Sequence, residues 1–317
     1  MRKRWFVLML AGLVSALWLA GCDKNNSTEP GTTGTNDKDA MSSIVADDAL
    51  FQTDVLLLND GDPTAAVTSS NSLGKVGTTI IPRNWGRKVE TFSRNINFTT
   101  LTDSTAIATV THSLLGFVWI NAKYTSKDST FSTIKKNFSE TIVRLIKFVR
   151  INRTKDPRNN WKISEISAIK GGTTGTQITI NEVRFYTGND TVVVTDPNNT
   201  FMKLEKGVGR FVPELTADIN VPIRAQVTVI SSASDSDFVY VHRPYFNAGQ
   251  WQYRAHMNLV SSTPNGDGTF TRLYEISWKG VWQGRHNMLV SAVTRGSILD
   301  DTTPFSSQIW GVPFIVQ

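Results

Sequence analysis

Cysteine is nearly absent from this sequence, which places a single cysteine, Cys22, in a chain of 317 residues. A disulfide needs two cysteines, so stability must come from packing and hydrogen bonding. The chain has only four histidines, and it contains no G-x-S-x-G, H-E-x-x-H, P-loop, G-x-G-x-x-G or EF-hand spacing. The sequence therefore predicts a protein that is not an enzyme and has neither a cofactor nor a metal site.

A long hydrophobic run is also lacking. The apolar segment from Trp5 to Ala20 falls short of the roughly 20 residues that a membrane-spanning helix needs. Three basic residues, Arg2, Lys3 and Arg4, precede this segment, and small residues follow it. A basic start, a short apolar core and small residues at a cleavage point are typical of a secretory signal peptide.

The signal ends in Leu19-Ala20-Gly21-Cys22, and this motif resembles the lipobox of bacterial lipoproteins. The resemblance implies a signal peptide over residues 1–21, cleavage before Cys22, and a diacylglycerol on the Cys22 sulfur, usually with a further acyl chain such as palmitate on the new amine. Two or three acyl chains anchor a protein stably, whereas one chain does so only marginally. The expected partner of Cys22 is membrane lipid, and the expected location is extracytoplasmic.

The sequence leaves open which membrane holds this anchor. Asp23 matches the position that retains enteric lipoproteins in the inner membrane, but Lys24 is not a residue that reinforces this signal. Anchoring to the cell membrane and anchoring to the outer membrane are therefore both expected possibilities.

The mature chain carries little net charge. The 33 Lys and Arg residues against 27 Asp and Glu give +6, and removal of Arg2, Lys3 and Arg4 with the signal lowers the net charge to +3. This modest excess, together with an extracytoplasmic location, does not favour nucleic acid as a partner.

Composition divides the rest of the chain into a tether and two folded parts. Residues 22–43 are rich in Gly, Thr, Asn and Asp and poor in apolar residues, which predicts a flexible tether of roughly 25 Å. Beyond the tether, abundant Thr, Ser, Asn, Val and Ile favour strands. A turn near Asp196–Asn199 places the boundary between the two folded parts close to residue 200.

Residues 44–199 are expected to form an α+β domain with an antiparallel sheet. One helix face holds Ile44, Leu50, Val55, Leu56 and Leu58, and the helix should end at residues 60–63. Strand patterns follow over 88–98, 105–124, 142–153, 161–169 and 177–188, with a hairpin around 170–176. The segments "DSTAIATV" and "WKISEIS" resemble strands of the NTF2-like family, which implies a cone-shaped sheet that can hold a pocket. His112 or Glu140 facing such a pocket would support an enzyme.

Residues 200–317 show short strand patterns at regular spacing, which are typical of an immunoglobulin-like β-sandwich. Asn265-Gly266-Asp267-Gly268 predicts a hairpin within this part. The segments "GRHNMLVSAVTRG" and "WGVPFIVQ" resemble the last two strands of bacterial immunoglobulin-like domains. The fold class predicted for the whole chain is thus α+β followed by all-β.

Two groups of side chains are candidates for ligand contact. Tyr245, Trp251 and Trp282 could stack on sugar rings, although Trp side chains also fill sandwich cores. Arg153, Lys155 and Arg158 could bind phosphates of lipid headgroups or lipopolysaccharide, although they also fit a solvated loop.

Three functions follow in order of preference. The first is a membrane-anchored envelope lipoprotein with a non-catalytic binding, adhesion or assembly role and an unknown envelope protein or polysaccharide as partner. The second is a polysaccharide-binding protein that uses aromatic residues of its C-terminal part. The third is an enzyme with a pocket in the N-terminal part.

Overall fold

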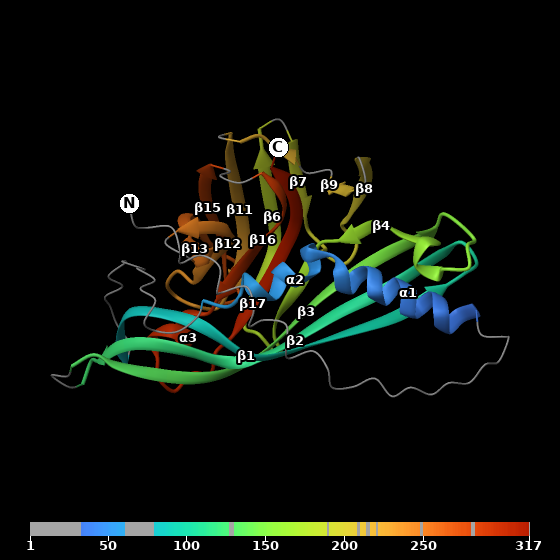
Figure 1. The fold of residues 1–317 in the computed structure, drawn as a ribbon. Helices are drawn as coiled ribbons and strands as arrows, with labels where there is room; N and C mark the ends of the chain where they lie inside the picture. The colour runs from blue at the N-terminus through green and yellow to red at the C-terminus, as the bar shows by residue number, and fades with distance from the viewer. Residues whose placement is uncertain are drawn as a thin grey trace, which may run out of the picture.

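The computed structural model describes residues 33–60, 79–126, 130–188, 190–207, 210–213, 216–219, 221–247, 250–279 and 283–316. Strands dominate the fold, and nearly all of them pair in an antiparallel manner. Two short helices stand at the N-terminal end of the described chain, before the first strand. One sheet has 12 strands and curls into a half-barrel, and a second sheet has five strands (Figure 1).

Three long strands form one part of the curled sheet. They are β1 (Ile80–Leu101), β2 (Thr105–Tyr124) and β3 (Ser132–Arg150), which follow one another as antiparallel neighbours (Figure 1). Buried and exposed residues alternate along β2 and β3, as expected for strands with one face in a core. The strand predicted over residues 105–124 is confirmed at both ends.

The remaining strands of the curled sheet continue from β3. In the main path the order is β13-β12-β16-β17-β5-β3-β4-β8-β9, and β10 adds to β17 in parallel. These strands are β4 (Trp161–Ser167), β5 (Ile169–Thr173), β8 (Phe201–Gly207), β9 (Arg210–Pro213), β10 (Thr216–Ala217), β12 (Phe238–Asn247), β13 (Gln250–His256), β16 (Gly284–Val293) and β17 (Ser307–Val316).

The second sheet lies against the outer side of β12, β16 and β17. Its order is β14-β15-β11-β6-β7, and all its pairs are antiparallel. The hairpin predicted at residues 265–268 is confirmed, since it joins the two strands at one end of this order. The strands are β6 (Ile178–Thr187), β7 (Asp190–Val194), β11 (Pro222–Ser231), β14 (Asn258–Pro264) and β15 (Phe270–Lys279).

Three hydrophobic cores hold the layers together. Strands β12, β16 and β17 bury both faces: Val239, Val241 and Val290 point toward the second sheet, whereas Tyr240 and Leu289 point into the half-barrel. The period-2 alternation of a strand therefore places every second residue of this middle layer in a different core. The third core lies between the long strands and the N-terminal helices.

The helices begin earlier than the composition indicates. Helix α1 (Thr33–Asp47) and helix α2 (Ala49–Leu56) replace the predicted single helix from Ile44, so the tether prediction is wrong for residues 33–43. Met41 is fully buried against the long strands, and Asp37 pairs with Arg150 at 2.6 Å. These tertiary contacts stabilise the N-terminal half of α1, whose composition alone favours coil. Residues 22–32 lie outside the described chain.

The predicted hairpin around residues 170–176 does not form. Strand β5 pairs with β3 and β17, whereas β6 pairs with β11 and β7, so the chain crosses from one sheet to the other at this point. At Gly172, φ is +131° and the backbone of Ser307 lies within contact of the position that a Cβ would take. Gly171 and Gly172 thus serve the close approach of three strands, whereas Gly175, with φ of +69°, lies in the turn that follows β5.

Both sheets contain strands from either side of residue 200. Strand β17 pairs with β5 in one sheet, and β11 pairs with β6 in the other. The division of the chain into two folding units near residue 200 therefore stays a prediction. Two short elements complete the fold, the 3₁₀ turn η1 (Pro157–Asn159) and helix α3 (Arg295–Leu299). Among the described residues, no helix has both the length and the apolar character that crossing a membrane requires.

Candidate functional site

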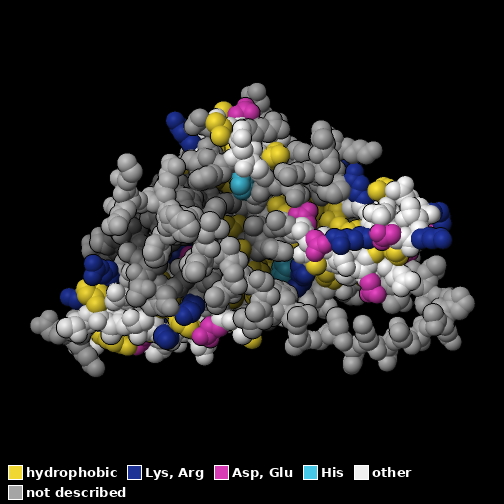
Figure 2. All heavy atoms as spheres, in the orientation of Figure 1, with side chains coloured by type: hydrophobic (Ala, Val, Ile, Leu, Met, Phe, Trp, Pro, Cys, Tyr) yellow, Lys and Arg dark blue, Asp and Glu magenta, His cyan; other side chains and the backbone are white. Residues whose placement is uncertain are grey.

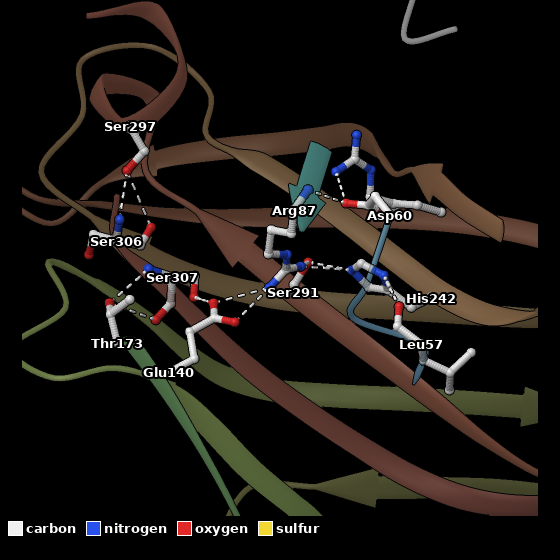
Figure 3. Close-up of polar contacts among 11 residues, drawn as sticks. Leu57, Asp60, Arg87, Glu140, Thr173, His242, Ser291, Ser297, Ser306 and Ser307 are labelled. Atoms are coloured by element: carbon white, nitrogen blue, oxygen red, sulfur yellow. Dashed lines mark hydrogen bonds and ion pairs between the residues drawn. The ribbon is translucent and has the colours of Figure 1, made fainter. Parts of the chain in front are cut away.

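The densest group of buried polar side chains lies inside the half-barrel. Arg87 on β1, Glu140 on β3, His242 on β12, Ser291 on β16 and Ser307 on β17 meet there, and each is at most 1% exposed (Figure 3). We call these five residues the Arg87 cluster. It joins strands from both ends of the chain, so the fold must be complete before the cluster exists.

Arg87 is the centre of this cluster. Its Nη1 donates to both carboxylate oxygens of Glu140, at 3.1 and 3.2 Å, and the side chains of both residues are fully buried. The Ser307 hydroxyl donates to the same carboxylate. A buried carboxylate is tolerable only with such partners, because removing a charge from water costs several kcal/mol.

The second amino group of Arg87 contacts a serine–histidine pair. Its Nη2 lies 3.2 Å from His242 Nε2 and 3.1 Å from Ser291 Oγ, and these two atoms are 2.7 Å apart. His242 Nδ1 lies 2.9 Å from the Leu57 carbonyl oxygen, so the ring donates from Nδ1 and accepts at Nε2. Burial, Arg87 and Arg254 lower the pKa of His242 well below its usual value, which keeps the imidazole neutral.

A neighbouring ion pair extends the network to the end of helix α2. Asp60 Oδ2 accepts from Arg254 Nη1 at 2.7 Å and from the Arg87 backbone N–H at 2.9 Å. Arg254 also donates to the Trp85 carbonyl at 2.6 Å, and its guanidinium lies over the Trp85 and Tyr240 rings. This pair fastens the segment after α2 to the outer edge of β1 and to strand β13.

The Arg87 cluster has the parts of a nucleophile and a base, but these side chains are buried. A serine hydroxyl within hydrogen-bond distance of a neutral imidazole is the arrangement that activates serine nucleophiles. Ser291 is 0% exposed and His242 1%, and Arg87 donates to both of them. In this conformation the cluster can hold protons and join strands, and it offers no accessible reacting atom.

Sequence reasoning did not identify the Arg87 cluster. Of its five members, the sequence points only to Glu140 as a candidate for chemistry. A signal was present, because Arg87 follows Trp85 by two residues and therefore shares its strand face with a large apolar side chain. A charged residue in phase with a buried aromatic on a strand predicts a buried partner of opposite charge.

His112 and Glu140, the residues proposed to face a pocket, are both packed. Glu140 is 1% exposed within the Arg87 cluster, and His112 is 4% exposed on β2. Burial, with Arg94 and Arg144 nearby, lowers the pKa of His112 to about 4.

A second buried cation holds the loop around helix α3. Lys136 Nζ donates to the backbone carbonyls of Ser297 at 2.7 Å and Thr303 at 2.8 Å, and also to that of Asp300. Burial lowers the pKa of Lys136 to about 8, while Asp300 and Asp301 act in the opposite direction. Lys136 therefore joins strand β3 to helix α3 and to the loop that follows it, through three backbone carbonyls.

The basic loop after β3 is largely neutralised by acids. Arg153 forms a two-pronged pair with Asp103, and Arg158 pairs with Asp47 at the end of α1. Lys155 is exposed beside them. Basic and acidic side chains lie next to one another at the end of the molecule that α1 occupies (Figure 2). These three predicted anion-contact residues lie close in the chain, and the two arginines already have carboxylate partners.

The predicted carbohydrate and lipid contacts lie outside what the structure describes. Cys22 and Trp282 are not among the described residues, and the side chains of Tyr245 and Trp251 on β12 and β13 are not described either. Within the described ranges, no group of three or more His, Cys, Asp or Glu residues lies close enough together to hold a metal ion.

The middle of the outer face of the three long strands, between lysines at its two ends, is an exposed surface whose cross-strand rows hold no charged residue. Between Phe117, whose ring lies beneath Lys88 and Lys135 at one end, and Lys147 at the other, its residues are Ser, Thr or Asn apart from Ile107, Leu115, Val143 and Leu145. None of these residues is buried. We call this surface the neutral face; it contains Thr91, Ser93, Asn95, Asn97, Thr100, Ile107, Thr109, Thr111, Ser113, Leu115, Asn137, Ser139, Thr141, Val143 and Leu145.

Comparisons with protein-family models, with curated proteins and with solved structures found no match to this chain.

Proposed function

We propose that this protein is a membrane-anchored envelope lipoprotein with a non-catalytic binding or assembly role. The lipobox motif at Cys22 supports the membrane anchor. The burial of the polar side chains of the Arg87 cluster supports the non-catalytic role. The mature fold would then stand outside the cytoplasm, held by acyl chains on Cys22. Its partner would be an envelope protein or a polysaccharide.

One observation carries the non-catalytic part of this proposal. The residues best suited to acid–base or nucleophilic chemistry, His242, Ser291 and Glu140, are at most 1% exposed and bonded to one another through Arg87. Packed positions for His112 and Glu140 also count against a reactive pocket in the N-terminal part. Exposed surface, rather than an enclosed site, is therefore the place to look for function.

The proposed fold families are an NTF2-like first part and an immunoglobulin-like sandwich in the second. Two antiparallel sheets packed over one core support the sandwich. Its strands would include β6 and β7, which precede residue 200. The long curved strands, with α1 and α2 on their inner side, support the first assignment. Fold likeness alone assigns no reaction.

A polysaccharide is the second candidate ligand, and the neutral face favours it. Hydroxyl and amide groups across three neighbouring strands can exchange hydrogen bonds with sugar hydroxyls, and no charge needs to be desolvated there. The aromatic residues Tyr245, Trp251 and Trp282 remain the other proposed sugar contact.

Two experiments test these proposals separately. For the anchor, cells that express the full chain are fractionated and labelled with a fatty-acid probe; label and membrane association should both disappear in Cys22→Ser. For the ligand, intrinsic Trp fluorescence is followed during titration with neutral polysaccharides. A saturable shift lost in Trp251→Ala assigns the aromatic site, and one lost in Thr109→Lys/Thr111→Lys assigns the neutral face. A flat response across the panel rejects polysaccharide and leaves a protein partner.

A further inference from the structure

Among the described residues, part of the outer edge of strand β1 has no partner. Near Arg87 the edge is occupied, because Asp60 and Asn59 bond to the backbone of Arg87 and Val89. Between Thr91 and Phe98, no described residue pairs with the outer edge, and β2 is the only strand paired with β1. An open edge is a ready template for another strand.

Two β-bulges delimit this open edge. The β1–β2 register shifts between Val89 and Thr91 and again between Phe98 and Thr100, while the ladder between these points is regular. Bulges interrupt pairing and twist an edge away from neighbouring chains. The regular stretch from 92 to 98 is therefore the part of this edge that can accept a strand.

The stretch Phe-Ser-Arg-Asn-Ile-Asn-Phe has a phenylalanine at each end and uncharged polar residues at 93, 95 and 97, so these positions are alike on the two sides of Asn95. In an antiparallel pairing of two copies centred there, Asn95 lies opposite the second copy's Asn95 and Ser93 opposite the second copy's Asn97. Phe92 lies opposite the second copy's Phe98. Aromatic pairs directly across an antiparallel ladder are stabilising. Phe92 is 59% exposed in the single chain, so this pairing would cover it.

Charge supports the same register. Centring on Asn95 places Arg94 opposite the second copy's Ile96, whereas centring one residue earlier would place two Arg94 side chains directly opposite each other. Like charges in that position are destabilising. Centring one residue later would carry the pairing past Phe98 into the bulge.

We propose that the open edge of β1 pairs with β1 of a second copy of this chain, antiparallel and centred on Asn95. The pairing is a twofold, self-complementary contact. A ladder this short buries little surface, so it is weak in dilute solution. Two chains anchored in one membrane meet at a much higher effective concentration. This inference names a second copy of the chain as the partner in the proposed assembly role, and it rests on that proposed function.

Single cysteines test the register in cells that express the full chain. In the proposed dimer, residue 95 lies in a pair without hydrogen bonds, whose Cα atoms are about 4.5 Å apart and can form a disulfide. Asn95→Cys should therefore give a covalent dimer on mild oxidation. The matched control Asn97→Cys should not, because the two cysteines would be about 13 Å apart along the strands. Both positions are exposed on the neutral face, and the parent chain with Cys22 gives the background.

A pair of charge variants in the Asn95→Cys background makes the test independent of oxidation conditions. Ser93→Glu with Asn97→Lys places opposite charges across the twofold axis and should keep or raise the dimer yield. Ser93→Glu with Asn97→Glu places like charges there and should lower the yield about threefold or more. No dimer with Asn95→Cys, or equal dimer with Asn97→Cys, overturns the proposal. Membrane fractionation of the same cells reports on the anchor separately, so loss of pairing and loss of anchoring are distinguishable.

Discussion

The same ion-pair chemistry has two different roles in this protein. In the Arg87 cluster, Arg87 and Glu140 have fully buried side chains and join strands that are far apart in the chain. In the loop after β3, Arg153 and Asp103 form a pair of the same type with side chains 68% and 72% exposed. Water already solvates the exposed charges, so their pairing adds little, whereas the buried charges depend on each other. Burial, rather than the number of contacts, decides which pair matters.

The largest effect is expected for Glu140→Gln. This change leaves the Arg87 guanidinium buried without its counter-charge, and breaking one side of a buried pair costs about 3–5 kcal/mol. Urea unfolding should show this loss of unfolding free energy. Glu165→Gln is the matched control, because Glu165 pairs with Lys147 at 2.7 Å with both side chains about one-third exposed. The control should lose less than about 1 kcal/mol. Equal losses in the two variants would contradict the distinction between buried and exposed pairs.

Acid should lower the free energy of unfolding, because buried histidines bind protons when the chain unfolds. The folded-state pKa of His112 is about 4, below its ordinary value of 6.5, so only the unfolded chain binds this proton between those values. Stability is full above pH 6.5 and falls as the pH drops toward 4, by about 3 kcal/mol at most from this residue. His242 and His256 shift in the same direction and add to the slope.

His112→Gln tests this expectation, because glutamine has no proton to gain. Unfolding free energies measured from pH 4 to 7 should show a shallower slope than the parent chain, by up to one proton. A variant whose slope matches that of the parent would show that His112 is already protonated, or exposed, in the folded state.

The strands were predictable from sequence, whereas the buried polar cluster was not. Residues 105–124 alternate between buried and exposed positions, so their pattern predicts a strand without any knowledge of its neighbours. Helix α1 has no such pattern, and contacts such as that of Met41 with the long strands determine where it begins. The Arg87 cluster joins five strands that are separated by up to 204 residues between bonded partners. The local pattern around Trp85 and Arg87 indicates that Arg87 needs a buried partner of opposite charge, but it does not identify Glu140, 53 residues away, as that partner.

A smaller loss is expected for Lys136→Met, which removes the donor shared by three loop carbonyls. An unsatisfied buried acceptor costs about 1–3 kcal/mol, and part of this cost should appear as faster hydrogen exchange in residues 294–303. The folded-state pKa of Lys136 is about 8 against the usual 10.5, so the unfolded chain binds more protons between these values. The parent chain should therefore gain stability relative to the variant as the pH rises from 8 to 10.5. A pH-independent difference would place the ammonium in water.

The smallest effect is expected for the exposed loop, where Arg153→Gln should leave the melting temperature unchanged. Removing this guanidinium should still raise the pKa of Asp103 toward its ordinary value of 3.8, because the hydrogen bond and charge of Arg153 are what lower it. Carboxylate titration by NMR would detect that shift, and 1 M salt should reduce it in the parent chain. Since both loop arginines already have carboxylate partners, replacing Arg153, Lys155 and Arg158 together with Gln should barely change binding to anionic vesicles. A large loss of vesicle binding would instead mean that lipid phosphate displaces Asp103 and Asp47, and that the exposed pairs matter for function although they do not matter for stability.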